Sequence, residues 1–245
     1  PLARFDAAPR RAGERHGVVL TIGHVNRSKR AESVIRAIGD SPVLRSQLSY
    51  QLVGAIEPDV ADQLKHLADS CGVRLDIQGR VDDDSLCRAI HQADIVSCLR
   101  LPALEGASAS AIEAMLHGKA VVVANTGFYR DLPDRCVRKI DPGNEVADLQ
   151  DALEDLHLNP DKRISMGLLA KEWAERTFVA SDYAKQLVDI SLDAIGARQV
   201  NAMLQHFVEI SASWSPDPLA VMNSDTLRPL QVFDDIRDEG RDRLQ

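Results

Sequence analysis

Two glutamates stand eight positions apart in the sequence, and the residues between them are mostly small. Glu105 is followed by Gly106, Ala107 and Ser108, and Glu113 falls inside a segment with helical spacing. Small residues let a ligand approach the backbone, and the amides at a helix start attract phosphate oxygens. A carboxylate can bind two neighbouring hydroxyls through its two oxygens. The stretch therefore predicts a pocket in which a helix start holds a diphosphate and the two glutamates hold sugar hydroxyls.

A purely structural explanation fits the same stretch. Ser110 and Glu113 have the spacing of a capping box, in which the serine caps the helix and the glutamate bonds back to a backbone amide. The pattern alone leaves both interpretations open.

A basic segment, TIGHVNRSKR, supplies the cations that a phosphate would need. Gly23 ends an apolar run, Lys29 opens the next helical segment, and His24, Asn26 and Arg27 lie between them. Such a loop can direct a lysine and an arginine at a phosphate, although a solvated basic loop explains it equally well. The chain has neither a G-x-G-x-x-G fingerprint nor a G-K-[ST] phosphate loop, so NAD(P) binding and NTPase activity lack support.

A third segment, LDIQGRVDDDSL, could receive a flat base. Gly79 follows an apolar run, and Arg80 and Val81 come next. The alternative is an ordinary loop before a helix, with Asp83 or Asp84 as the helix cap.

Apolar β-rich runs and amphipathic helical segments alternate along residues 17–140 and must position these groups. The runs cover 17–25, 48–56, 73–79, 94–100, 119–127 and 136–140, and the helices between them cover 28–40, 58–72, 83–93 and 108–118. This alternation predicts an α/β fold with a doubly wound parallel sheet, Rossmann-like in character. Ligands bind such sheets at the carboxyl ends of the strands, where loops 23–29, 79–84, 100–110 and 125–130 would gather.

The ends of the chain differ from this middle part. Residues 1–16 are predicted to be a linker or arm, and residues 17–197 a single domain that finishes with helices over 146–157, 161–178 and 182–197. Gly39 is a predicted stop for the first helix. Residues 198–245 combine an amphipathic stretch with a polar tail, whose last thirty or so residues are expected to pack poorly or against another part.

Composition excludes several classes of protein. A net charge of −8 argues against a nucleic-acid binder, and the short apolar runs argue against a membrane span. The four cysteines lack zinc or disulfide spacing, and the seven histidines form no metal cluster in the sequence. We expect reduced thiols, no metal and a cytoplasmic location.

The order of these segments resembles the C-terminal, donor-binding half of a glycosyltransferase family 4 enzyme with the GT-B fold. The resemblance covers about residues 17–190 and is most specific at LEGASASAIEAMLHGK, where E-G-x-S precedes the second glutamate and E-A-M-x-x-G begins at it. It implies transfer of a sugar from a nucleotide-diphosphate sugar, with retention at the anomeric carbon and without a metal or other cofactor. The implied acceptor is a glycan or a lipid-linked molecule, and the implied setting is bacterial surface polysaccharide synthesis.

The same resemblance assigns roles to the candidate residues. Glu105 would lie at the donor sugar, the Gly106–Ser108 amides at the sugar and phosphate, and Glu113 at the ribose. Lys29 would bind the diphosphate, and the backbone near Arg80 and Val81 the base. The family usually has arginine where this chain has His24; Arg27 would have to replace that charge.

These enzymes also have an N-terminal acceptor-side half, for which residues 1–245 hold no second alternating sheet. The chain begins at Pro1, so we expect a fragment, with any peripheral membrane association belonging to the absent part. Two other functions stay open: a GT-B nucleotide-sugar epimerase and a noncatalytic nucleotide-sugar-binding module.

Overall fold

The computed structural model describes the backbone of residues 16–214 and the side chains of residues 16–210. The chain divides into two compact units, residues 1–178 and 179–245. The first unit contains the whole sheet. The helix predicted over 182–197 belongs to the second unit. Apart from His16, the predicted arm lies outside the described residues, as does the tail after Trp214.

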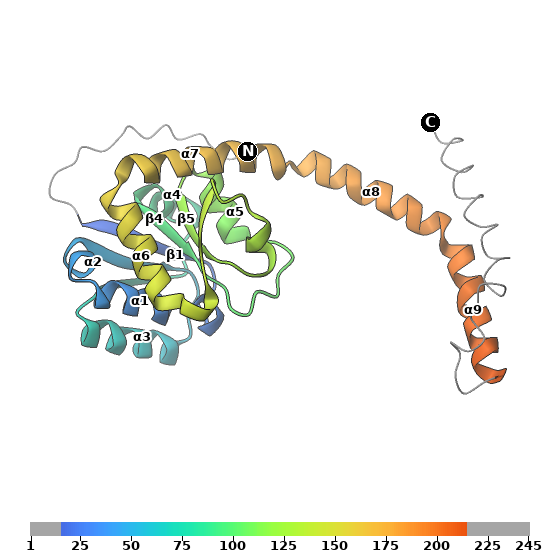
Figure 1. Ribbon diagram of the computed structural model, residues 1–245, viewed down its shortest axis with the longest axis horizontal. Helices are drawn as coiled ribbons and strands as arrows, with labels where there is room; N and C mark the ends of the chain where they lie inside the picture. Colours follow the sequence, from blue (N-terminus) through green and yellow to red (C-terminus); the bar gives the residue numbers. More distant parts are fainter. Residues whose placement is uncertain (1–15, 215–245) are drawn as a thin grey trace. The chain divides into compact units, whose positions relative to one another are not determined.

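Six parallel strands form one sheet in the order β3-β2-β1-β4-β5-β6 (Figure 1). The strands are β1 (Gly17–Ile22), β2 (Leu48–Val53), β3 (Arg74–Gly79), β4 (Ile95–Cys98), β5 (Ala120–Ala124) and β6 (Val137–Ile140). The order reverses between β1 and β4, the point at which doubly wound sheets bind ligands. The predicted α/β fold class is confirmed.

The strand sequences follow from how each strand is covered. All five residues of β5, AVVVA, are buried, as expected for an inner strand with helices on both faces. The edge strand β3, RLDIQG, instead alternates exposed and half-buried positions. Its charged and polar residues therefore face solvent, and its apolar residues face the helices.

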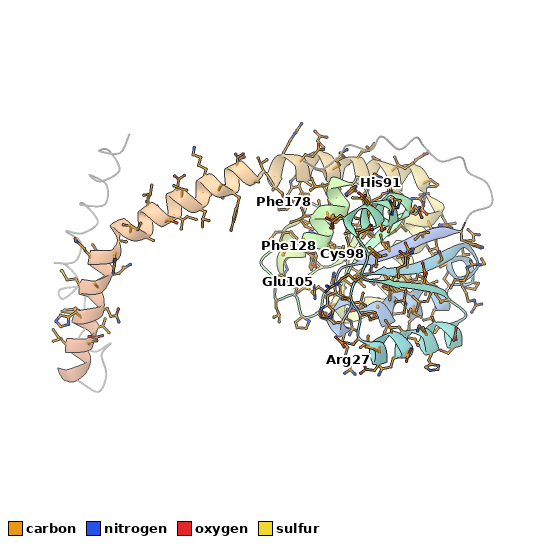
Figure 2. The ribbon with its side chains drawn as sticks, turned by 180° about the vertical axis from the view of Figure 1, so that it is seen from behind. Arg27, His91, Cys98, Glu105, Phe128 and Phe178 are labelled. Carbon is orange, nitrogen blue, oxygen red and sulfur yellow. The ribbon has the colours of Figure 1, made fainter. Side chains whose placement is uncertain are left out.

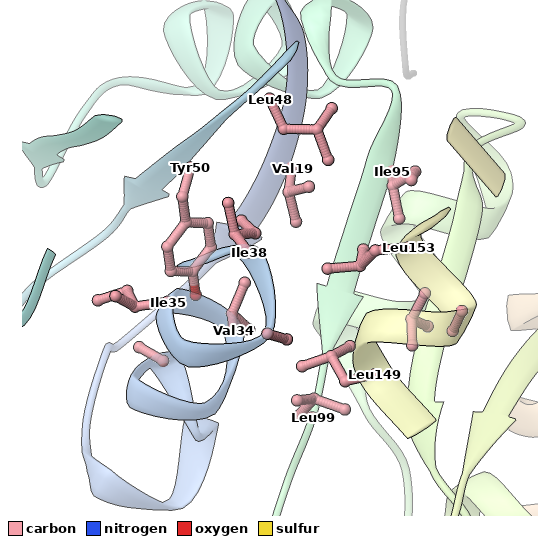
Figure 3. Close-up of a cluster of buried hydrophobic side chains, with 14 of the residues drawn as sticks. Val19, Val34, Ile35, Ile38, Leu48, Tyr50, Ile95, Leu99, Leu149 and Leu153 are labelled. Carbon is pink, nitrogen blue, oxygen red and sulfur yellow. The ribbon is translucent and has the colours of Figure 1, made fainter. Parts of the chain in front are cut away.

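Helices cover both faces of the sheet (Figure 1). On one face lie α1 (Ala31–Asp40), α2 (Pro42–Gln47), α3 (Pro58–Cys71) and α6 (Glu145–Leu158). On the other lie α4 (Asp83–Gln92), α5 (Ala109–Leu116) and α7 (Pro160–Thr177). Figure 3 shows the first core, where Val34 and Ile38 of α1 and Leu149 and Leu153 of α6 pack on the strands. Truncating one such buried aliphatic side chain typically costs about 2–5 kcal/mol.

Two predicted helix ends differ from the structure by one or two residues. Gly39 lies inside α1, which ends one residue later at Asp40. A β-carbon at Gly39 would lie 2.7 Å from Cys71 Cβ, at the end of α3, so the two helices approach closely at this glycine. Here glycine permits helix packing instead of ending the helix. The cap of α4 is Asp82, whose carboxylate accepts from Ser85 N at 2.7 Å, and not Asp83 or Asp84.

The second unit contains α8 (Ala180–Gly196) and α9 (Arg198–Trp214). The amphipathic stretch that begins at Val200 lies in α9. No side chain of α8 is buried. None of the helices between residues 16 and 214 combines the length and the apolar character that crossing a membrane requires.

Candidate functional site

Lys29 is the buried cation of the site. It ends η1 (Arg27–Lys29), a 3-10 turn separate from α1, and only 4% of the residue is exposed. Its Nζ donates to Ile22 O at 2.8 Å and to Ser110 Oγ at 3.0 Å. Both acceptors are neutral, so neither cancels the ammonium charge. Burial lowers the pKa of Lys29, and the neighbouring Arg100 lowers it further.

The start of α5 meets the end of β1. Ser108 is the N-cap of α5, and its hydroxyl accepts from Ala111 N at 3.3 Å. Ser110 lies inside the helix and donates to Ile22 O at 3.3 Å, so the alternative explanation of a capping box between Ser110 and Glu113 is wrong. The positive end of the α5 dipole and the Lys29 ammonium therefore lie together at the carboxyl end of β1.

Glu105 is paired with an arginine that the sequence analysis did not select. Its Oε1 lies 2.6 Å from Arg100 Nε, and its Oε2 accepts from Leu104 N at 3.2 Å. Arg100 Nη1 donates to Ser28 Oγ at 2.8 Å. Arg100 follows β4 by two positions. Its place just after the carboxyl end of a strand, where such sheets bind ligands, could have identified it from the sequence.

Three glycines stand in a row at the ends of β1, β2 and β3. Gly23, Gly54 and Gly79 have φ angles of +89°, +143° and +65°, which disfavour other residues. Gly54 N donates to Gly79 O at 2.7 Å, and a β-carbon on Gly54 would lie 1.9 Å from Gly23 O. Gly54 is thus required by close backbone packing. Its position after an apolar run, like that of the other two, could have identified it.

Beside these glycines lies a hollow of about 270 Å³. It brings together four of the predicted residues with four others: Gly23, His24, Arg80 and Val81, and Val53, Gly54, Ala55 and Leu86. Apolar side chains and exposed backbone suit a flat, partly polar group such as a nucleobase.

Glu113 lies on the side of α5 near the start of α4. Partial burial raises the pKa of its carboxyl group, and the negative charge of Asp83 raises it further. Asp83 stands in the first turn of α4, directly after the 79–84 loop. Burial raises the pKa of the Cys98 thiol, at the end of β4, to about 11; Lys29 and Arg100 lower it, and Glu113 raises it. The glutamate is therefore within electrostatic reach of Cys98 at a strand end and of Asp83 at the start of α4.

The 125–130 loop closes against the 100–110 loop. A β-carbon on Gly127 would lie 2.8 Å from Ala103 Cβ. Tyr129 is 2% exposed; burial raises the pKa of its hydroxyl group, and the neighbouring Ser108 side chain lowers it. Gly106 and Ala107 are exposed, with open space where a Gly106 side chain would be. The amides that precede α5 thus stand on an accessible surface.

Two further predicted residues, Asn26 and Arg27, lie in and beside η1. The Asn26 side chain caps η1, accepting from Ser28 N at 3.1 Å and from Ser28 Oγ at 2.6 Å. Arg27 is exposed and has no ion pair among the described residues. Figure 2 shows where Arg27, Glu105 and Cys98 lie in the domain, and it shows His91 away from all three.

Within residues 16–210, no group of three histidine, cysteine or acidic side chains is placed to hold a metal ion.

Comparison with solved structures gives the same fold. The chain is 21% identical to HepE of Anabaena in complex with UDP, with a TM-score of 0.64, covering 72% of this chain and 48% of that one. It is 21% identical to the catalytic domain of the Helicobacter pylori cholesterol-α-glucosyltransferase, with a TM-score of 0.57, covering 65% of this chain and 98% of that one. The C-terminal domain of LpcC from Francisella tularensis is 18% identical, with a TM-score of 0.59 and coverages of 68% and 89%. At such identities the likeness shows the fold alone.

The chain spans about half the length of HepE. No curated protein gives a significant match. The family model described as glycosyl transferases group 1 matches residues 4–173. Since this match covers well over half of the chain, the protein belongs to the group 1 glycosyl transferases.

Proposed function

We propose that this chain is the donor-binding domain of a retaining, metal-independent glycosyltransferase of family 4 that uses a nucleotide-diphosphate sugar. The observation that carries the proposal is the meeting of Lys29 with the first turn of α5, through Ser110, at the switch point of the sheet. A buried ammonium beside a helix N-terminus is an environment that favours a phosphate group.

The neighbouring groups fit the remaining parts of such a donor. The hollow beside Gly23 and Gly54 would take the base. Glu113 would bind the ribose hydroxyls, and Glu105 with the Gly106–Ser108 backbone would bind the sugar. HepE structures contain UDP, UDP with glucose, and UDP-glucose, which supports a donor of this class for the present chain.

The proposed reaction transfers a hexose to a glycan or lipid-linked acceptor in bacterial surface polysaccharide synthesis. A relative involved in lipopolysaccharide biosynthesis, WaaG, has the same fold, with 21% identity and a TM-score of 0.58. Acceptor binding would fall to a second, N-terminal domain, which we also propose as the site of any peripheral membrane contact. The four cysteines are free thiols, which supports a reducing, cytoplasmic compartment.

A thermal-shift screen with UDP-, GDP-, ADP- and CMP-linked sugars tests the proposal. We expect one nucleotide class to raise the unfolding temperature of the wild type, because a ligand that binds only the folded state stabilises it. Glu113→Ala should abolish most of that rise, whereas Glu175→Ala, at an exposed position on α7, should keep it.

Two results would contradict the proposal. No stabilisation by any of the four classes at millimolar concentration would indicate a domain that has lost the pocket. Formation of an epimerised sugar nucleotide in the absence of an acceptor would indicate an epimerase.

A further inference from the structure

Arg100 joins the two loops that flank the proposed diphosphate site. Its guanidinium contacts Ser28 on the β1 side and Glu105 on the α5 side. The backbone repeats this connection, since Leu101 N donates to Ser28 O at 2.9 Å. The arginine side chain is 21% exposed, so most of it is enclosed between the loops.

The contact between Arg100 and Glu105 is an ion pair without hydrogen-bond alignment. Nε lies 2.6 Å from Glu105 Oε1, yet this buried nitrogen makes no aligned hydrogen bond to any group that the structure describes. A buried N–H without an aligned acceptor loses the hydrogen bonds it would make in water. Arg100 is thus held near Glu105 with part of its donor capacity unused.

The charges around Arg100 favour an anion. Arg100 donates to Ser28, the residue before Lys29. Burial lowers the pKa of Lys29 most and Arg100 lowers it further, while Cys98 and Glu105 raise it. Lys29 donates only to neutral oxygens, and Arg100 contacts one carboxylate, that of Glu105. Among the described residues, the two cations together are therefore paired with a single negative charge. A second anionic group would relieve the repulsion between the cations.

We propose that Arg100 is the second phosphate-binding cation of this site and that a bound diphosphate displaces Glu105 from it. The inference rests on the proposed function and adds a residue and an exchange of partners to it. The planar guanidinium group of arginine can donate two hydrogen bonds at once to the oxygens of a phosphate. Release from Arg100 leaves the Glu105 carboxylate available for the hydroxyls of the donor sugar. The site thereby converts a carboxylate held by a cation into a sugar-binding group only when the diphosphate is present.

Calorimetric titration with inorganic pyrophosphate tests this role. The ligand without phosphate is uridine where the thermal-shift screen selects UDP, and the corresponding nucleoside where it selects another base. We expect Arg100→Gln to weaken pyrophosphate binding about 10-fold or more, since a charge-assisted hydrogen bond is lost. Arg100→Lys should recover part of that loss, and uridine binding should not change. Arg176→Gln, at an arginine that is 77% exposed on α7, is the matched control and should bind pyrophosphate as the wild type does.

Exchange of partners makes a second prediction. If Glu105 competes with phosphate for Arg100, Glu105→Gln should tighten pyrophosphate binding about 3-fold or more. The same change should have a much smaller effect when Arg100 is already glutamine, since the double-mutant cycle isolates their coupling.

Any one of the following results would overturn the inference: unchanged pyrophosphate affinity in Arg100→Gln, equal loss of pyrophosphate and uridine binding in that variant, or equal effects of Glu105→Gln in both backgrounds. The first two would make Arg100 a structural link between loops. A larger loss in Arg27→Gln than in Arg100→Gln would assign the second cation to Arg27. Failure of the wild type to bind pyrophosphate, UDP or any nucleotide sugar would contradict the proposed function itself.

Discussion

Lys29 and Ser110 are 81 positions apart in the sequence, and the lysine Nζ donates a 3.0 Å hydrogen bond to the serine hydroxyl. The bond joins the turn after β1 to the first turn of α5. Ser110 also donates to the Ile22 carbonyl, to which Lys29 donates as well. These three groups fix the ammonium next to the positive end of a helix, so the fold maintains a positive potential at this point without a ligand.

Replacing Gly54 should disrupt the glycine row. In Gly54→Ala the new β-carbon would lie 1.9 Å from Gly23 O, at a φ of +143° that alanine strongly disfavours. Because the atoms that the β-carbon would meet belong to the Gly23 backbone, no flexible side chain can move away. We expect a loss of about 2–4 kcal/mol in the free energy of unfolding, measured by urea denaturation.

Gly106→Ala is the matched stability control, because no atom lies within 4 Å of a β-carbon at that glycine and its φ is not positive. Its unfolding free energy should stay within about 0.5 kcal/mol of the wild type. Equal stability of the two alanine variants would show that the close approach of Gly54 to Gly23 does not exist in solution.

Glu113 should stabilise the domain at low pH and destabilise it at neutral pH. Its pKa in the folded state lies above the usual 4.5, mainly through burial and also through Asp83. The folded protein therefore binds this proton more tightly than the unfolded chain does. The stabilising contribution is complete below about pH 4.5 and is lost as the pH rises through the folded-state pKa.

Glu113→Gln removes that titration. We expect the variant to be more stable than the wild type at pH 7 and the difference to shrink towards pH 4, as measured by unfolding at both pH values. Its stabilisation by the nucleotide found in the screen should nevertheless be smaller, because the amide is a weaker partner for ribose hydroxyls than a carboxylate. A variant that is less stable at pH 7, with unchanged nucleotide binding, would show that Glu113 has a structural role.

Arg30 and Glu145 should contribute unequally to stability. Arg30 Nε donates to both carboxylate oxygens of Glu145, at 2.9 and 3.0 Å, across 115 positions. The Glu145 side chain is 7% exposed and that of Arg30 is 40% exposed. Arg30→Met would leave the buried Glu145 carboxylate without its cation. In Glu145→Gln the arginine stays partly exposed to water and can still donate to the amide oxygen of the glutamine.

We expect Arg30→Met to lower the free energy of unfolding by about 2–3 kcal/mol and Glu145→Gln by about 1 kcal/mol. Arg30 has a φ of +55°, which disfavours arginine and methionine alike. Backbone strain at this position is therefore the same in the wild type and in Arg30→Met. Urea denaturation of both decides the order, and a larger loss in Glu145→Gln would refute this account of the pair.

The strands and most helices could be predicted from the sequence because burial on both faces selects continuous β-branched runs. AVVVA in β5 is the clearest case. Glycines at the ends of three such runs marked the edge where ligands bind. The short helix α2 was missed because its six residues, PVLRSQ, are too few for an amphipathic period.

Residues whose roles depend on packing between distant segments could not be predicted from local patterns. Glycine is a residue type that often ends helices, but Gly39 instead gives room for the close approach of Cys71 on another helix. Ser108 and Ser110 are equally good caps by residue type, and contact of Ser110 with Ile22 and Lys29 separates them. The pairing of Arg100 with Glu105 depends on the path of an irregular loop.

The most direct test of the central claim is the ratio of the affinities for UDP and uridine in Lys29→Met, measured by calorimetry, with the diphosphate and nucleoside of another base in their place where the thermal-shift screen selects that base. Methionine keeps an unbranched side chain that is one heavy atom shorter and carries no charge, and replacing a buried charge by an apolar group is often tolerated. Lys65→Met, at an exposed lysine on α3, is the control. The account predicts that the diphosphate strengthens binding in the wild type and in the control, and that Lys29→Met loses this advantage by about 10-fold or more while binding uridine normally. An unchanged UDP-to-uridine ratio in Lys29→Met would contradict it.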